Sequence, residues 1–455
     1  MKVVLFVSCF LPKHFYGTEM YTFYLAQNLR VMGYEVIVVS AGFPWEPRQA
    51  EAVTRYEYEG FPVYLIDKNY FPIGRYRDTY YQPAMIRAFK DLLQKLEPDI
   101  VHITSLANHT AVLPEVTASL GIPTVATLTD FFGICCNSNL LTADGSLCAG
   151  PDRYGTNCII CRIKWEPKNG GKAYIPSWAR RQPVATLYLF GCRLKGDVAR
   201  YRKVGISTFV PDIMRRSKVL TSSYNTCHAV IAPTRFLRDA YIANGLRAPI
   251  EVSHFGIDVS RGAKPARPSG VSIKFGFIGR IAPNKGLDLL LKAFARLPRG
   301  RAELLVYGSE MQASGYLDEV KSLAQGLMVS FQGTFPSREI GDVMEKIDFL
   351  VIPSRWYENS PLVLLNALAS HTPVVVADVD GMTEFVEDGR NGFIFKREDS
   401  VDLERVLRMI IEEPSGARTM SLTTEYPRTT RMMAGEVVAM YEKVMAGKTC
   451  SEGKV

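Results

Sequence analysis

Two cationic side chains, Arg280 and Lys285, stand five residues apart at the end of an apolar run. This run, residues 273–279, has the composition of a buried strand, and a helix is predicted to begin after Gly286. The positive end of a helix dipole and its free N–H groups favour an anion, as do the two cations. A diphosphate suits two fixed cations. Ordinary surface charges beside a helix start are the alternative.

A second polar cluster follows another apolar run, residues 348–352. It contains Glu358, Asn359 and Ser360, with Pro361 next and an apolar helical pattern beyond. Ser360 is predicted as the N-cap and Pro361 as the first helical residue, which leaves backbone N–H groups free to hold a phosphate. The Glu358 carboxylate can accept hydrogen bonds from hydroxyl groups.

The elements that would position both clusters alternate between strand and helix patterns along the chain. Apolar runs of strand length are separated by amphipathic segments of helical length, which is typical of parallel sheets. Ligands of such sheets bind beyond the carboxyl ends of the strands, where both clusters fall. The predicted fold class is α/β, with two doubly wound Rossmann-like domains facing each other across a cleft.

Length and composition agree with two domains. A chain of 455 residues is too long for one core, and 47% hydrophobic with 22% charged residues excludes global disorder. No apolar run approaches the roughly 20 residues that span a bilayer. The N-terminal run from Lys2 to Leu11 resembles a short signal sequence but is interpreted as a buried first strand. The predicted segments are an N-terminal domain 1–259, a linker 260–270, a C-terminal domain 271–432, a helix 433–447 and a tail 448–455.

The second cluster carries a family resemblance. The residues from Glu358 onward read ENSPLVLLNALASHTPVVVADVDGMTEFVEDGRNGFIF, which resembles the donor-binding signature of GT-B glycosyltransferases of family 4. Gly17-Thr18-Glu19 after the first strand also matches this family, as do Gly381 and Glu384. The resemblance implies a retaining, metal-independent enzyme that needs no cofactor and transfers a sugar from a nucleotide-diphosphate sugar to a glycan or lipid-linked acceptor. The C-terminal domain would bind the nucleotide sugar and the N-terminal domain the acceptor.

The resemblance also implies a role for individual residues. Arg280, Lys285 and Glu358 would be catalytic, the two cations by stabilising the leaving diphosphate in place of a metal. The donor would be held by Asn359, by Asn366, and by the backbone N–H groups of Ser360, Leu362 and Val363. Gly17 would let the first loop of the N-terminal domain approach the donor phosphate, and Thr18 beside it would also bind the substrate.

Two positions depart from the family pattern. A second glutamate usually stands eight residues after the first, and here that position is Asn366. Many members carry a histidine where this chain has Thr129, and His102 and Asp130 are expected to remain as polar, substrate-facing groups near it. These departures motivate an alternative function, that of a non-catalytic nucleotide- or glycan-binding protein.

Five cysteines fall within the loop 131–165, four of them with metal-ligand spacing. Cys158 and Cys161 are separated by two residues, and Cys135 and Cys148 could complete four thiolates for a structural zinc or an iron–sulfur cluster. A subset of the resembling family carries cysteines at matching places. Disulfides and reduced, packed thiols are the alternatives.

Positive charge is concentrated in one part of the N-terminal half. Residues 151–250 hold 18 Lys and Arg against 5 Asp and Glu, a net charge of +13. Basic and aromatic residues interleave over 162–218, which suits an anionic membrane surface or a pyrophosphate-linked acceptor. An ordinary solvated face is the alternative, and no nucleic-acid-binding motif accompanies the stretch. The predicted location is cytoplasmic, with peripheral attachment at the inner face of the membrane.

Overall fold

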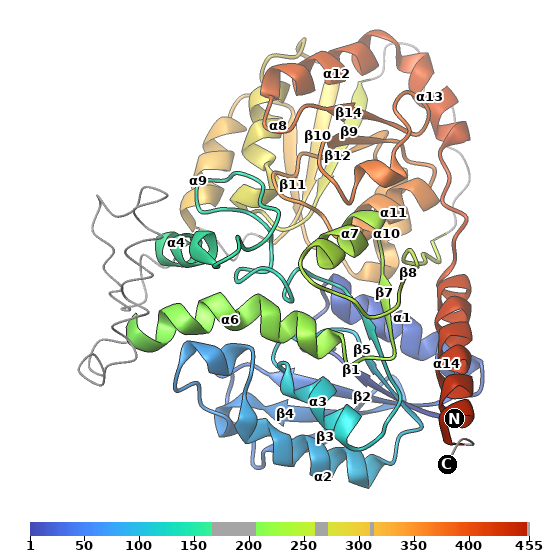
Figure 1. Ribbon diagram of the computed structural model, residues 1–455. Helices are drawn as coiled ribbons and strands as arrows, with labels where there is room; N and C mark the ends of the chain where they lie inside the picture. Colours follow the sequence, from blue (N-terminus) through green and yellow to red (C-terminus); the bar gives the residue numbers. More distant parts are fainter. Residues whose placement is uncertain (166–205, 260–271, 310–313, 453–455) are drawn as a thin grey trace. The chain divides into compact units, whose positions relative to one another are not determined.

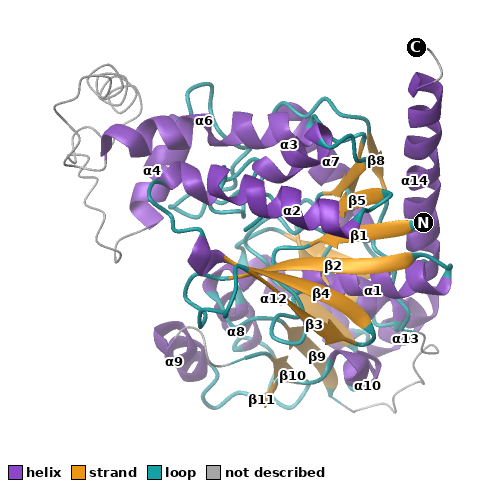
Figure 2. Cartoon of the chain, turned by 90° about the horizontal axis from the view of Figure 1, so that it is seen from below, coloured by secondary structure: helices purple, strands orange, loops and turns teal. Residues whose placement is uncertain are grey.

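The computed structural model describes residues 1–165, 206–259, 272–309 and 314–452. The chain divides into two units, the first made of Met1–His254 with Met433–Val455 and the second of Phe255–Met432. Each unit is built around one sheet of mainly parallel strands (Figures 1 and 2). GT-B proteins have two Rossmann-like domains of this kind.

The first unit contains an eight-stranded sheet in the order β3-β4-β2-β1-β5-β6-β7-β8. Its strands are β1 (Lys2–Phe6), β2 (Glu35–Gly42), β3 (Val53–Tyr58), β4 (Phe61–Asp67), β5 (Ile100–Ile103), β6 (Thr124–Thr127), β7 (Ala229–Ala232) and β8 (Ile250–Val252). Its helices are α1 (Gly17–Val31), α2 (Ile86–Leu96), α3 (Val112–Ser119), α4 (Thr156–Trp165), α6 (Ile206–Tyr224), α7 (Arg235–Ala243) and α14 (Thr430–Glu452).

The predicted first strand lies in the middle of this sheet. β1 pairs in parallel with β2 on one side, where Val4 is opposite Ile37, and with β5 on the other. Its apolar run is buried on both faces because helices cover both sides of a doubly wound sheet. From β1 to β2 the chain moves toward the β3 edge of the sheet, and from β5 to β6 it moves toward the β8 edge. Because both crossovers are right-handed, their helices α1 and α3 lie on opposite faces of the sheet.

The second unit contains a six-stranded, fully parallel sheet in the order β11-β10-β9-β12-β13-β14. Its strands are β9 (Ile273–Ile278), β10 (Ala302–Tyr307), β11 (Val329–Gly333), β12 (Phe349–Ile352), β13 (Val374–Ala377) and β14 (Gly392–Phe395). Its helices are α8 (Leu287–Phe294), α9 (Ser314–Leu323), α10 (Ile340–Glu345), α11 (Leu362–Ala369), α12 (Ser400–Glu412) and α13 (Pro414–Thr423). In Figure 1, α8 and α9 lie on one side of this sheet and α10 and α11 on the other. In chain order this is the 3-2-1-4-5-6 arrangement of dinucleotide-binding folds.

Three features differ from the sequence-based prediction. β3 runs antiparallel to β4, joined by a two-residue turn at Glu59 and Gly60 that both adopt positive φ. The last helix begins at Thr430 and extends to Glu452, through much of the segment predicted as a tail. It belongs to the first unit, where the Tyr441 hydroxyl bonds His102 Nδ1 at 2.6 Å. The predicted linker 260–270 lies outside the described residues.

Among the residues that the structure describes, no helix combines the length and the apolar character that crossing a bilayer requires.

Candidate nucleotide-sugar site

The strand order of the second unit brings the two predicted clusters together. β9 and β12 are neighbours, and the chain leaves β9 toward β10 on one side and leaves β12 toward β13 on the other. This is the topological switch point, where the loops after the two strands diverge and leave room for a ligand. The loop after β9 carries Arg280 and Lys285, and the loop after β12 carries Glu358.

The two loops touch through a glycine. Gly286 has a φ of +73°, and a Cβ placed on it would lie 2.0 Å from the carbonyl oxygen of Pro353. Only a residue without a side chain permits both this backbone conformation and this approach. The short 3₁₀ turn Pro283–Lys285 is thereby pressed against the end of β12.

Glu358 is the centre of the polar contacts in this place. Its buried carboxylate accepts hydrogen bonds at Oε1 from Lys285 Nζ at 2.6 Å, from Ser354 Oγ at 2.5 Å and from Trp356 Nε1 at 2.8 Å. The Lys285 ammonium also lies over the Trp356 ring, 5.1 Å from its centroid. The structure therefore unites Lys285 and Glu358, which are 73 residues apart in the chain, in one ion pair.

The N-terminus of α11 forms the next part of the site, with one correction. The predicted N-cap was Ser360, but Pro361 occupies that position and the helix begins at Leu362. Ser360 has a φ of +56°, a left-handed conformation from which the helix does not start directly. The N–H groups of Leu362 and Val363 are at the helix start and have no acceptor within the helix.

Three polar atoms beside this helix start lack a partner. The Nδ2 and Oδ1 atoms of Asn359 and the Oγ atom of Ser360 are buried and make no hydrogen bond. Buried polar atoms without partners are uncommon because each costs the free energy of its lost hydration. Both residues belong to the cluster that was predicted to bind the donor.

Arg280 and Asn366 complete the predicted set in this unit. Arg280 is exposed, and its guanidinium makes no hydrogen bond or ion pair with a described residue. Asn366 donates from Nδ2 to the Leu362 carbonyl oxygen, one turn earlier, at 2.7 Å. Its amide therefore points back toward the start of α11.

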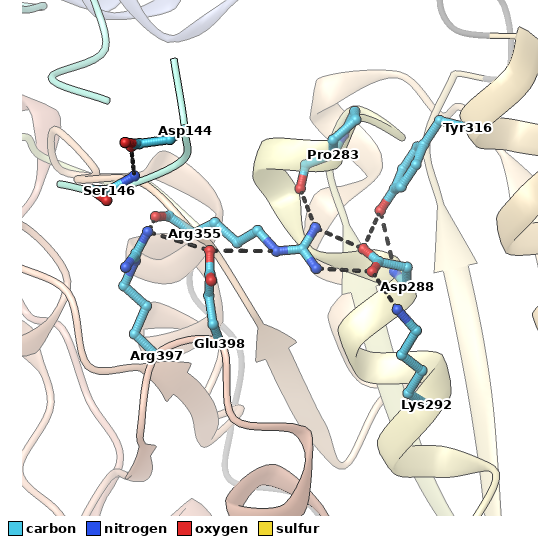
Figure 3. Close-up of polar contacts among 9 residues, drawn as sticks. All are labelled: Asp144, Ser146, Pro283, Asp288, Lys292, Tyr316, Arg355, Arg397 and Glu398. Carbon is cyan, nitrogen blue, oxygen red and sulfur yellow. Dashed lines mark hydrogen bonds and ion pairs between the residues drawn. The ribbon is translucent and has the colours of Figure 1, made fainter. Parts of the chain in front are cut away.

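A salt-bridge network that sequence reasoning missed supports the loop after β9. Arg355 donates two hydrogen bonds to the Asp288 carboxylate, both at 2.8 Å, and a third of the same length to the Pro283 carbonyl oxygen (Figure 3). Tyr316 and Lys292 contact the same carboxylate at 2.8 and 3.1 Å. Burial favours a raised pKa for Asp288, but the hydrogen bonds from Arg355 and Tyr316 outweigh it and lower the pKa to about 2.

Arg355 is itself fixed from a third direction. Its carbonyl oxygen accepts a hydrogen bond from Arg397 at 2.7 Å, and its side chain lies 3.8 Å from Glu398 (Figure 3). The network joins the loop that carries Lys285, the start of α8 and the loop that carries Glu358. Arg355 lies between Ser354 and Trp356, but no local sequence pattern indicates that its partner is Asp288, 67 residues away.

In the first unit, Gly17 and Thr18 form the first turn of α1. A Cβ on Gly17 would meet no atom within 4 Å, and φ at Gly17 is not in the left-handed region. The fold itself therefore does not require glycine at this position. Glu19 beside it is buried, with Oε1 accepting from Cys9 Sγ at 3.0 Å.

His102 occupies different surroundings from those expected, whereas the role of Asp130 stays a prediction. The His102 ring is fully buried, and its two nitrogens bond the Tyr441 hydroxyl and the Thr127 hydroxyl, the latter at 2.7 Å. Neither nitrogen is left to contact a substrate, so the expectation of a substrate-facing histidine is corrected: this residue ties α14 to the sheet. Asp130 lies after β6 and accepts from the Phe132 N–H at 2.7 Å. The Thr129 hydroxyl donates a hydrogen bond to the Thr104 carbonyl oxygen at 2.7 Å.

The cysteine loop does not assemble four thiolates. Within the described residues, no three Cys, His, Asp or Glu side chains are placed to share a metal ion. Cys148 Sγ accepts from the Gly150 N–H at 3.4 Å, and Cys161 Sγ accepts from Asn137 Nδ2 at 3.3 Å. Burial raises the pKa of Cys161 to about 11. Cys135 is buried and free. In the described residues these thiols are not gathered as a four-thiolate centre, and the structural metal site stays a prediction from the sequence.

Most of the basic stretch, residues 166–205, lies outside the described residues. Arg215 and Lys218 of α6 are exposed, whereas Arg216 is 4% exposed and lies over the Phe132 ring, 4.5 Å from its centroid. Arg216 therefore does not contribute to a surface patch.

Two protein families match the chain. The model "Glycosyl transferases group 1" matches residues 265–425, and the model "Glycosyltransferase Family 4" matches residues 15–132. Together the two matches cover more than half of the chain. With the Rossmann-like fold of each unit, they show that the chain belongs to the GT-B glycosyltransferases of family 4.

Characterised relatives share part of the chain. The D-inositol 3-phosphate glycosyltransferase of Rhodococcus opacus is 33% identical over 174 residues, which cover 36% of this chain and 38% of the relative. The mannosylfructose-phosphate synthase of Agrobacterium fabrum is 31% identical over 201 residues, covering 40% and 44%. The matched part is therefore less than half the length of these relatives.

Solved structures share the whole fold at low identity. Anabaena HepE in complex with UDP and glucose has a TM-score of 0.62 and 15% identity, covering 97% of this chain and all of that chain. The sucrose-phosphate synthase of Thermosynechococcus elongatus has a TM-score of 0.62 and 16% identity, covering 98% and 99%. At this identity the likeness establishes the fold.

Proposed function

We propose that this protein is a retaining, metal-independent glycosyltransferase that uses a nucleotide-diphosphate sugar. The observation that carries the proposal is the ion pair of Lys285 and Glu358 at the switch point of the second unit, beside the unpartnered side-chain atoms of Asn359 and Ser360. HepE, which has the same fold, binds UDP and glucose. The proposed acceptor is a glycan or a lipid-linked saccharide, and the proposed location is the cytoplasm or the inner membrane face.

The diphosphate would be held by fixed positive charge. Arg280 is unpaired among the described residues, and Lys285 has three donors, of which Glu358 accepts one. The N–H groups of Leu362 and Val363 add the positive end of a helix. Charges that are already in place when the diphosphate leaves need no reorganisation, so they lower the barrier to its departure. We therefore propose that these groups perform the role that a metal has in other glycosyltransferases.

Glu358 would hold the donor sugar. Its Oε2 atom is not used by the three donors that converge on Oε1, so it can accept a hydrogen bond from a sugar hydroxyl. Asn359 and Ser360 would bond the sugar or phosphate with the atoms that lack partners here. Attack on the face that holds the leaving diphosphate would give retention, as in the family.

A donor screen tests this proposal. UDP-, GDP- and ADP-sugars are incubated with the protein in the presence of EDTA, and release of the nucleoside diphosphate is measured. We expect turnover of at least one donor, and a loss of about 10²- to 10³-fold in kcat for Arg280→Ala. Arg299→Ala is the control, because this exposed arginine precedes β10 at the opposite edge of the sheet. Full activity of Arg280→Ala would show that the site is misassigned.

A non-catalytic binding protein is the second candidate, favoured by Asn366. An amide at this position replaces a carboxylate and donates a hydrogen bond to its own helix. Binding of a nucleotide without turnover of any donor in the same screen would support this candidate instead.

A further inference from the structure

An exposed tryptophan stands at the carboxyl edge of the first sheet. Trp45 is 76% exposed, although its ring is stacked on Phe43 with a centroid separation of 4.4 Å and an interplanar angle of 12°. Since Phe43 covers one face of the indole, the high exposure means that the other face is open to solvent. The open face of the indole therefore offers a large, rigid apolar surface together with an N–H donor.

The turn that carries this ring is held in place on several sides. The Glu46 carboxylate accepts from the Phe43 N–H at 3.3 Å, and the Glu46 N–H donates to the Phe43 carbonyl oxygen at 3.0 Å. Glu46 Oε1 also bonds His14 Nε2 at 2.9 Å, and the Glu46 carbonyl oxygen accepts from Asn69 Nδ2 at 3.0 Å. The turn that carries Trp45 is thus fixed before a ligand binds, so binding loses less conformational entropy.

The surrounding loops belong to the ligand-binding edge of a parallel sheet. The turn follows β2, and His14 lies in the loop that follows β1, its neighbour in the sheet. That loop also carries Phe15 and Tyr16, 61% and 53% exposed and stacked with centroids 6.0 Å apart, immediately before Gly17. Two stacked aromatic pairs, with Trp45, Phe15 and Tyr16 exposed, are therefore placed on adjacent loops beyond the carboxyl ends of β1 and β2.

We propose that Trp45 is a stacking platform for a pyranose ring of the acceptor saccharide. The negative face of an aromatic ring attracts the C–H groups that line one face of a pyranose. Both oxygens of the neighbouring Glu46 carboxylate already bond to His14 or Phe43, but each keeps a lone pair that can accept a hydrogen bond from a sugar hydroxyl. The inference rests on the proposed function, because it assigns a binding place to the acceptor of that reaction.

The test measures saccharide binding by the full-length protein. Saturation-transfer difference NMR is recorded with a panel of short oligosaccharides built from glucose, galactose, mannose and N-acetylglucosamine. We expect at least one to bind, Trp45→Ala to weaken its binding about tenfold, in line with the energy of an aromatic contact, and Trp45→Phe to retain most of the affinity. Tyr154→Ala is the matched control, an exposed aromatic in the cysteine loop of the same unit. A melting curve for each variant confirms that it is folded.

Three results would overturn this inference. They are the absence of binding by any saccharide in the panel, equal affinities of Trp45→Ala and the wild type, and a loss of binding to phosphatidylglycerol vesicles in Trp45→Ala while saccharide binding is unchanged. Calorimetry of wild-type protein with UDP reports separately on the proposed function. If saccharide binding depends on Trp45 but the protein binds no nucleotide, the proposed donor site is refuted. The proposal that Trp45 binds a saccharide is still supported in that case.

Discussion

Removal of Arg355 is expected to loosen the loop that carries Lys285. Arg355→Ala deletes two hydrogen bonds to Asp288 and one to Pro283. Breaking a buried pair by removing one partner costs about 3–5 kcal/mol. Arg355 is 23% exposed, and Asp288 keeps Lys292 and Tyr316 as partners. We therefore expect a smaller local cost, about 2–3 kcal/mol.

Hydrogen exchange measured by mass spectrometry reports this cost locally. A loss of about 2–3 kcal/mol corresponds to opening that is roughly 30- to 150-fold more frequent, so peptides that cover residues 279–292 should exchange faster by that factor. Lys292→Ala is the matched control. It removes one contact of the same carboxylate, but this lysine is 46% exposed and its pair lies at helical i,i+4 spacing, for which about 0.3–0.5 kcal/mol is typical.

The same network makes a pH-dependent contribution. The pKa of Asp288 is lowered to about 2 in the folded protein, so its stabilising contribution is present above the pKa of the unfolded carboxyl group and is lost as the pH falls toward 2. Arg355→Ala should therefore reduce the fall in the free energy of unfolding as the pH is lowered toward 2. Unchanged exchange in the loop, or an equal effect of Lys292→Ala, would refute the reasoning.

Three further predictions concern single positions in the two units. Gly381→Ala should lower donor affinity in isothermal titration with UDP-sugars, because φ is +86° and the added Cβ would lie 1.6 Å from the Glu358 carbonyl oxygen; unchanged affinity would mean that Glu358 does not bind the donor. Gly17→Val should leave the melting temperature nearly unchanged, since no atom lies within 4 Å of its Cβ position, while turnover falls at least tenfold if a phosphate approaches there; equal turnover would remove Gly17 from the site. Asn366→Glu should tighten nucleotide binding by about 1–2 kcal/mol, because charged hydrogen bonds are stronger than neutral ones, and weaker binding would show that the amide is adapted to a different group.

The alternation of strands and helices made much of the second unit predictable. Parallel strands share a carboxyl edge, so Arg280, Lys285 and Glu358 could be assigned to one end of a sheet from their positions after apolar runs. Lys285 lies next to Glu358 because β9 and β12 are neighbours in the sheet. This strand order cannot be predicted from local periodicity.

Other features depend on tertiary contacts that no local pattern encodes. His102 looked like a cleft residue because it ends a strand, but α14, more than 300 residues later in the chain, supplies the hydroxyl that occupies it. Asp288 and Arg355 meet only because the loops after β9 and β12 converge. The shift of the N-cap from Ser360 to Pro361, with the helix beginning at Leu362, follows from a left-handed backbone at Ser360 that its residue type does not suggest.

The most direct test of the central claim is the anomeric configuration of the product. NMR of the glycoside formed from an α-linked nucleotide-diphosphate sugar, with EDTA present, should show an α-linked product from the wild type. Arg280→Ala should form this product about 10²- to 10³-fold more slowly. A β-linked product, a requirement for added divalent metal, or no transfer from any donor while the protein is folded would contradict the account.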